Sequence, residues 1–108
     1  MKPSRVIPRG AAIRDAEDAT DYYIREAGDA VAFRFIDALQ AAYHRIGANP
    51  GIGSPRLGGL IGLPSLRTWP VRDFPYVICY EMGPGTVDVW RVLHAQSDIP
   101  EHLFQAGD

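Results

Sequence analysis

Two stretches in the first half of the chain repeat apolar residues every three or four positions, which is the period of an amphipathic helix. In residues 11–27 the repeat predicts one buried stripe, formed by Ile13, Ala16, Thr20, Tyr23 and Ala27. In residues 29–46 the same spacing recurs in Ala32, Phe35, Leu39, Ala42 and Ile46. Gly28 separates the two stretches, and so short a turn predicts an antiparallel helical hairpin.

The second half of the chain carries the alternating and short apolar runs that are typical of β-strands. Strands are predicted at residues 66–71, 76–82 and 86–94, and a short extended piece is predicted at residues 5–7. Pro70 indicates an edge strand or an early end, because proline cannot donate a ladder hydrogen bond. Strict alternation places four side chains of the last strand on one face, namely Val87, Val89, Arg91 and Leu93.

The remaining segments connect or follow these elements. Residues 47–65 hold six glycines and three prolines, which predicts a long loop. After the last strand, Asp98 is expected to cap a short helix, with Glu101 three residues later. The order β-α-α-β-β-β-α then predicts an α+β fold, in which an N-terminal helical hairpin packs on a small antiparallel sheet. Its 108 residues fit a single domain, residues 1–108.

Charge and reactive side chains narrow the chemistry. Eleven basic and thirteen acidic residues give a net charge of −2, without the basic block that usually marks a nucleic-acid binder. Folding can still cluster a few arginines, so an RNA substrate stays open. Cys79 is the only cysteine, and its apolar neighbours predict a buried, inert thiol. The three histidines, at 44, 94 and 102, lack the spacing of metal ligands, so no metal is expected. The glycines of residues 47–65 match neither the Walker nor the dinucleotide-binding spacing, and no cofactor is expected.

The start of the chain and its longest apolar runs bear on localisation. No run approaches the roughly 20 residues that a membrane-spanning helix needs. The first residues lack the apolar stretch of a signal peptide. A soluble cytoplasmic protein that makes no membrane contact is therefore expected.

Three segments of this order resemble the RelE/ParE toxin family, and in particular its ParE branch. The first helix carries Ala12, Asp15, Ala16 and Ala19, followed by Tyr22 and Tyr23. The second helix is followed by residues 49–56, which are similar to the family's post-helix Pro-x-x-Gly turn. The third segment comprises residues 66–71, 74–80 and 87–94, and its last strand ends in Arg-Val-Leu-His at 91–94. Together they cover nearly the whole chain.

The resemblance implies the toxin component of a type II toxin–antitoxin system. ParE-like members bind DNA gyrase and trap its cleaved-DNA intermediate without bond-breaking chemistry of their own, and this activity is the one expected here. RelE-like members cut messenger RNA in the ribosome, which needs a base, a cation on the phosphate and a proton donor. Under that alternative Arg67 and Arg91 would hold phosphate, His94 would act as acid or base, and Tyr76 or Tyr80 would donate a proton. A non-toxic protein-interaction module is the third possibility.

Two features argue against the nuclease. Some RelE-like members carry an arginine at the start of the third strand, where this chain has Phe74-Pro75-Tyr76. Lys2 is the only lysine. Structural roles are also open for the candidate residues: His94 can cap the turn after its strand, and Arg91 can pair with an acid such as Asp37 across the helix–sheet layer.

The resemblance also implies a ParD-like antitoxin that forms a hetero-oligomer with this chain. Its N-terminal half would be a ribbon–helix–helix module that binds DNA, while the toxin chain alone would not bind DNA. A groove between two helices suits an amphipathic helix from a partner, and an edge strand suits an added strand. The residues expected to contact the antitoxin are Tyr22, Phe33, Ile36, Tyr43 and Trp69.

Overall fold

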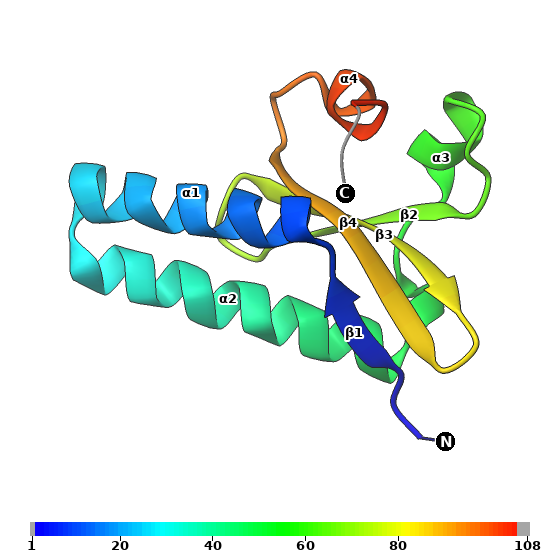
Figure 1. The fold of residues 1–108 in the computed structure, drawn as a ribbon. Coiled ribbons are helices and arrows are strands. Elements are labelled where there is room, and N and C mark those ends of the chain that lie inside the picture. Colours follow the sequence, from blue (N-terminus) through cyan, green and yellow to red (C-terminus); the bar gives the residue numbers. More distant parts are fainter. Residues whose placement is uncertain (1, 106–108) are drawn as a thin grey trace.

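A computed structural model describes residues 2–105 of the chain. Its elements follow one another as β1 (Arg5–Pro8), α1 (Gly10–Ala27), α2 (Asp29–Ala48), the 3-10 helix η1 (Pro50–Ile52), α3 (Arg56–Leu60), β2 (Leu66–Pro70), β3 (Tyr76–Gly83), β4 (Thr86–His94) and α4 (Ile99–Leu103). The antiparallel hairpin of α1 and α2 is the longest feature of the molecule (Figure 1). The predicted element order and the helical hairpin are confirmed.

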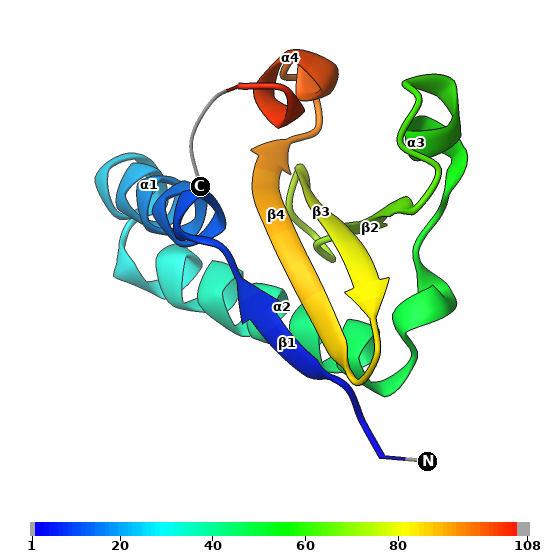
Figure 2. The ribbon, with the colours of Figure 1, turned by 45° about the vertical axis from the view of Figure 1, so that its right-hand side comes forward.

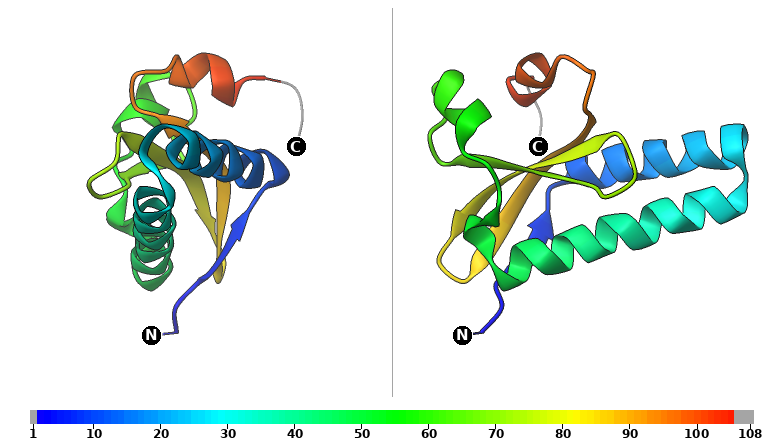
Figure 3. Two further views of the ribbon diagram at one scale, coloured as in Figure 1. Left: turned by 90° about the vertical axis from the view of Figure 1, so that its left-hand side faces the viewer. Right: turned by 180° about the vertical axis from the view of Figure 1, so that it is seen from behind.

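The four strands form one sheet in the order β1-β4-β3-β2. β2, β3 and β4 pair antiparallel as predicted, and β1 joins at the edge of β4 as a parallel strand, so the sheet is mixed. β2 forms the opposite edge and ends at Pro70, which confirms the expectation from that proline. The half of the hairpin around its turn extends beyond the sheet, which leaves more of its surface in solvent (Figure 3).

α1 faces the sheet with small side chains. Ala12 and Ala19 are buried, and Ala16 and Tyr23 pack at the border of the same core. The stripe predicted for this helix is wrong at Ile13, which is 47% exposed, and at Ala27 at the end of the helix, which is also exposed. Alanine lets a helix approach a sheet closely, and the bulkier isoleucine then points away from the contact. The stripe predicted for α2 is buried at all five positions and is confirmed.

A β-bulge interrupts the pairing of β4 with β3. Cys79 lies opposite Arg91, but Tyr80 lies opposite Val89, so Trp90 is an extra residue on β4. A bulge bends its strand and changes the face on which the following side chains lie. The strict alternation predicted for this strand is therefore wrong beyond Val89.

The consequence is visible in the two hydrophobic clusters. Val87 and Val89 lie in the main core between the sheet and the helices, and after the bulge Val92 lies there too. Leu93, predicted on the same face as Val87, instead joins a smaller cluster on the other side of the sheet. α3 and α4 lie on that other side (Figure 2). α4 contributes Ile99 and Leu103 to the smaller cluster, and the segment just after α3 contributes Ile61 and Leu63.

Cys79 also belongs to the smaller cluster and is fully buried, as predicted. Burial raises the pKa of its thiol to about 12, with the negative charge of Asp15 as a further cause. The thiol therefore stays protonated at neutral pH, which makes it a poor nucleophile.

The glycine-rich segment is more structured than the long loop predicted for it, because it contains η1 and α3. The buried Tyr80 hydroxyl holds it in place by donating to the carbonyl of Pro50 (2.7 Å) and accepting from the amide of Gly53 (2.8 Å). A side chain at position 53 would place its Cβ 2.5 Å from that hydroxyl oxygen, so only glycine fits. The predicted N-cap of the C-terminal helix α4 is confirmed, since the Asp98 carboxylate accepts a hydrogen bond from the amide of Glu101 at 3.2 Å.

Candidate functional site

A groove of about 710 Å³ runs between α1 and α2 beside the end of β1. We call it the interhelical groove. Its apolar members are Ile13 and Ala16 from α1 with Ile36, Leu39 and Tyr43 from α2. Glu17, Asp18, Thr20, Asp21 and Gln40 add polar groups along it. Because residues three or four apart lie on one face of a helix, these side chains form two facing lines along the hairpin.

Large apolar side chains extend this surface into solvent. Ile13 is 47% exposed, Ile24 on α1 is 45% exposed, and Phe33 on α2 is 65% exposed. Phe33 precedes Ile36 by three residues, so it continues the α2 line toward the turn of the hairpin. Exposed large apolar side chains near a groove on a small protein are typical of a surface that binds a partner.

Tyr43 connects the interhelical groove to the core. It lines the groove and also packs against the main hydrophobic cluster. Burial raises the pKa of its hydroxyl to about 12, and the nearby Asp15 carboxylate adds to the effect. The hydroxyl is therefore neutral at physiological pH and can donate a hydrogen bond to a bound segment.

The residues predicted to contact an antitoxin lie in three places. Ile36 and Tyr43 line the interhelical groove, and Phe33 lies one turn beyond Ile36 on α2. Tyr22 is 49% exposed and lines a different pocket, together with His94 and Arg91. Trp69 lies on β2 at the border of the core, with the Arg45 guanidinium carbon 6.0 Å from the centre of its ring.

Sequence reasoning missed the α1 wall of the groove. The predicted stripe places Ile13 and Thr20 in the core and gives Glu17 and Asp21 no role in binding. All four line the groove. The spacing of 13, 17, 20 and 24 is itself a second helical line beside the buried alanines. That line was the available signal.

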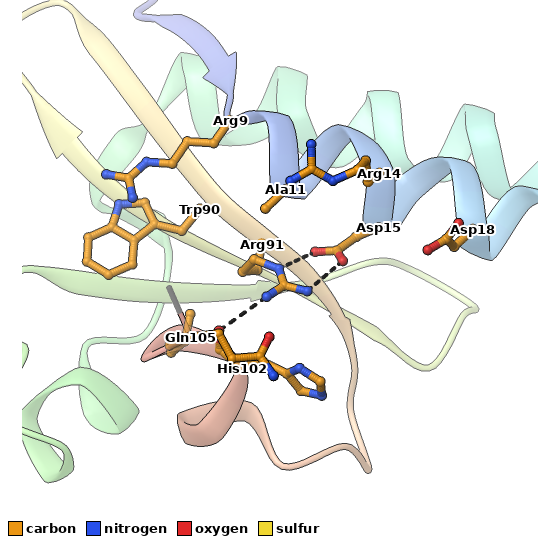
Figure 4. A pocket seen from close by; sticks show the side chains of 10 residues that line it. Arg9, Ala11, Arg14, Asp15, Asp18, Trp90, Arg91, His102 and Gln105 are labelled. Carbon is orange, nitrogen blue, oxygen red and sulfur yellow. Dashed lines mark hydrogen bonds and ion pairs between the residues drawn. The ribbon is translucent and has the colours of Figure 1, made fainter. Parts of the chain in front are cut away.

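On the other side of α1, Arg91 joins three elements (Figure 4). Its guanidinium donates twice to the Asp15 carboxylate, at 2.7 and 2.8 Å, and once to the carbonyl of His102, at 3.2 Å. The same carboxylate accepts the amide of Val92 at 3.0 Å. β1 ends at Pro8, so Asp15 supplies the acceptor that a longer edge strand would have given to β4. The predicted ion pair across the helix–sheet layer is confirmed in kind, but the partner is Asp15 and not Asp37.

A polar pocket of about 310 Å³ adjoins this ion pair and is lined by Arg9, Arg14, Asp18, Trp90 and His102, among others. Arg9 lies 4.6 Å above the centre of the Trp90 ring and donates two hydrogen bonds to Asp88, at 3.0 and 2.7 Å. The bond to Asp88 raises the pKa of Arg9, as the bond to Asp15 raises that of Arg91. Arg9 and Arg91 thus already have carboxylate partners, which lowers the attraction of this pocket for an anion.

The residues considered for RNA cleavage are not gathered at one place, and the Tyr80 hydroxyl is bound to Pro50 and Gly53. Arg91 and His94 line a common pocket with Tyr22 and Tyr76. Arg67 instead donates to the carbonyls of Gly51 (3.2 Å) and Gly53 (2.7 Å), so its guanidinium fastens the segment that contains η1.

His94 has the contacts of a turn residue. Its Nδ1 accepts the amide of Gln96 at 3.1 Å, and its carbonyl accepts the hydroxyl of Ser97 at 2.6 Å. Its ring meets that of Tyr76 edge-on at 5.4 Å. These contacts agree with the structural role that the sequence left open.

No helix within residues 2–105 is both long and apolar enough to cross a membrane.

Comparisons with known proteins agree with this architecture. Residues 6–99 match the family described as the ParE toxin of the type II toxin–antitoxin system parDE. A chain of the chromosomal ParDE toxin–antitoxin system from P. aeruginosa has a similar fold, with a TM-score of 0.70 and 17% sequence identity. That match covers 84% of this chain and 95% of the other. No curated protein sequence matches the chain.

At 17% identity the structural likeness establishes the fold alone. The family match establishes membership as well as fold, because it spans the chain from β1 to the start of α4. The chain therefore belongs to the ParE toxin family of type II toxin–antitoxin systems.

Proposed function

We propose that this chain is a toxin that a ParD-like antitoxin neutralises by binding in the interhelical groove, and that the free toxin poisons DNA gyrase. The observation that supports the first part best is the groove itself, with its apolar side chains and the exposed Ile13 on its α1 wall. The exposed Ile24 and Phe33 lie on the same two helices nearer the turn of the hairpin. Membership in the ParE toxin family supports the pairing with a ParD-like protein.

The antitoxin would bind by burying apolar side chains that the fold leaves in water. An amphipathic helix places anchors at positions i, i+3, i+4 and i+7, which match a groove between two helices. β1 and β2 are the edges of the sheet, so either offers backbone groups to an added strand. The antitoxin would carry the ribbon–helix–helix module and bring the complex to DNA, while this chain contacts the antitoxin only.

The contacts of the arginines favour gyrase over messenger RNA as the target. An RNA-cleaving site needs cations that are available to the scissile phosphate. Arg91 is bound to Asp15, and Arg67 is bound to two backbone carbonyls away from the pocket of His94. A gyrase poison needs no such site, because gyrase itself breaks the DNA.

The experiment is a plasmid assay with purified gyrase. The chain is expected to inhibit supercoiling and to accumulate gyrase-cleaved DNA in a dose-dependent way. Adding the cognate ParD-like antitoxin should abolish both effects. Gyrase that supercoils and cleaves normally at saturating toxin would refute the gyrase part of the proposal.

Ribosome-dependent RNA cleavage is the second candidate, favoured by the pocket that Arg91, His94 and Tyr76 share. It predicts that His94→Gln abolishes toxicity and that messenger cleavage on ribosomes accompanies growth arrest. The gyrase proposal predicts that the same variant, if folded, remains toxic. Growth of cells that express the two forms without antitoxin distinguishes the two candidates.

A further inference from the structure

The two walls of the interhelical groove differ in charge. The α1 wall carries three carboxylates, from Glu17, Asp18 and Asp21. The α2 wall is formed by the uncharged side chains of Ile36, Leu39, Gln40 and Tyr43. Among the residues that the structure describes, no lysine or arginine lines the groove. The groove is therefore apolar along its floor and acidic along one rim.

Glu17 and Asp21 define this acidic rim. Both are exposed, and they lie four residues apart on α1. Asp18 also lines the polar pocket on the opposite side of the helix (Figure 4), so it belongs less clearly to the groove. Within residues 2–105 neither Glu17 nor Asp21 makes an ion pair. Their charges are thus not neutralised by the toxin chain that the structure describes.

We infer that the segment which binds in the interhelical groove is a basic amphipathic helix, with lysine or arginine side chains opposite Glu17 and Asp21. This inference rests on the proposed function, in which the antitoxin occupies the groove. Residues four apart are separated by about 6 Å along a helix axis. Basic residues three or four apart in the partner would therefore face both carboxylates at once.

Lysine and arginine side chains of a bound helix could contact both the apolar residues of the groove and its acidic rim. Lysine and arginine can lay their aliphatic stems on apolar surface while the charged ends reach into water. Stems lying over Ile13 and Ile36 would place the charged ends near the α1 rim. Exposed ion pairs of this kind contribute mainly to the rate and the specificity of association.

Other occupants are disfavoured by the same charges. A second copy of this chain that bound groove to groove would bring carboxylates against carboxylates. Nucleic acid and anionic lipid would meet the acidic rim with charge of the same sign, on a chain whose net charge is already −2. A basic helix is the occupant that the rim attracts.

The test measures association of the full-length ParD-like antitoxin with three forms of the full toxin chain by surface plasmon resonance. The first is wild type, the second is Glu17→Lys/Asp21→Lys, and the third is Glu26→Lys/Glu101→Lys. Glu26 and Glu101 are exposed and do not line the groove, so the third form changes the net charge equally. Circular dichroism establishes that each form is folded, and Glu17→Gln/Asp21→Asn replaces the second form if it is not.

The rim variant should associate about tenfold more slowly than wild type at low salt, with a weaker dependence on salt concentration, because steering is lost. The control should stay within about twofold of wild type. Equal rates for the rim variant and the control overturn the inference. If Ile36→Ala still weakens binding in that case, the groove remains the antitoxin site and only the basic character of the partner is refuted. Wild-type toxin that does not bind the antitoxin refutes both the inference and the proposed function.

Discussion

The sheet-facing and solvent-facing sides of the helical hairpin have similar side chains and opposite burial. Phe35 and Ile46 face the sheet and are 0% exposed, whereas Phe33 and Ile13 are 65% and 47% exposed. Each helix thus carries a buried apolar line that forms part of the core and, outside that line, large apolar side chains that remain exposed. The comparison teaches that apolar residues at helical spacing on this hairpin serve two purposes, folding and partner binding. Substitutions that affect one purpose without the other test this separation.

The largest effect is expected for Phe35→Ala. Phe35 is fully buried and meets Tyr23, Phe74 and Tyr76 with ring centroids 5.3 Å apart in each pair. Its truncation should lower the free energy of unfolding by about 3–5 kcal/mol, through lost burial and the cavity left behind. Urea titration followed by circular dichroism measures the change. A loss below about 1 kcal/mol would mean that this side of the hairpin is not the main core.

Asp15→Asn should be the next most damaging change. It removes the charge that pairs with Arg91 and weakens the acceptor of the Val92 amide. The pair is largely shielded, with side-chain exposures of 18% for Arg91 and 13% for Asp15, so about 2–3 kcal/mol of unfolding free energy should be lost.

Asp18→Asn is the matched control, because Asp18 is exposed and makes no ion pair within residues 2–105. It should change stability by less than about 0.5 kcal/mol. Equal losses for the two variants in urea titrations would show that the Arg91 pair does not hold α1 to the sheet.

Tyr43 contacts both the core and the interhelical groove, and the pH dependence of stability tests whether its hydroxyl is buried. Its pKa is raised from 10.0 to about 12 by burial. In the unfolded chain the Tyr43 hydroxyl ionises above pH 10, whereas in the folded chain it ionises only above about pH 12. Ionisation between these pH values therefore favours the unfolded chain. The contribution of this hydroxyl to the free energy of unfolding is complete below pH 10 and is lost between pH 10 and pH 12. Between pH 8 and pH 11 the free energy of unfolding of the wild type should fall by about 1 kcal/mol more than that of Tyr43→Phe, as measured by urea titration at each pH. Parallel pH profiles for the two forms would place the hydroxyl in solvent.

The smallest effect on stability is expected for Phe33→Ala. With 65% of Phe33 exposed, the free energy of unfolding should change by about 0.5 kcal/mol or less. The affinity for the antitoxin should nevertheless fall by about tenfold, because a buried aromatic anchor would be lost from the complex. Calorimetric titration with the antitoxin measures it. Unchanged affinity would remove Phe33 from the binding surface and confine that surface to the groove.

Much of the fold could be predicted because it depends on local patterns. The period of apolar residues in 29–46 identified the buried face of α2 at all five positions, and Gly28 marked the turn of the hairpin. Asp98 and Glu101 predicted the cap of α4 from their spacing alone. In the candidate site, Ile36 and Tyr43, which the sequence analysis expects to contact the antitoxin, line the groove. The α1 wall was missed because the periodicity of α1 fits more than one stripe, and only contact with the sheet selects the alanines.

The sequence by itself therefore determined α1, α2, α4, the strands and their order along the chain, since each of these depends on neighbours a few residues away. It did not predict η1 and α3. Only the tertiary structure decided the bulge at Trp90, the partner of Arg91 and the placement of Arg67 apart from His94. Asp15 and Arg91 are 76 residues apart in the chain. The pairing of such distant groups depends on strand register and on the docking of α1, and neither is encoded in the local alternation of polar and apolar residues.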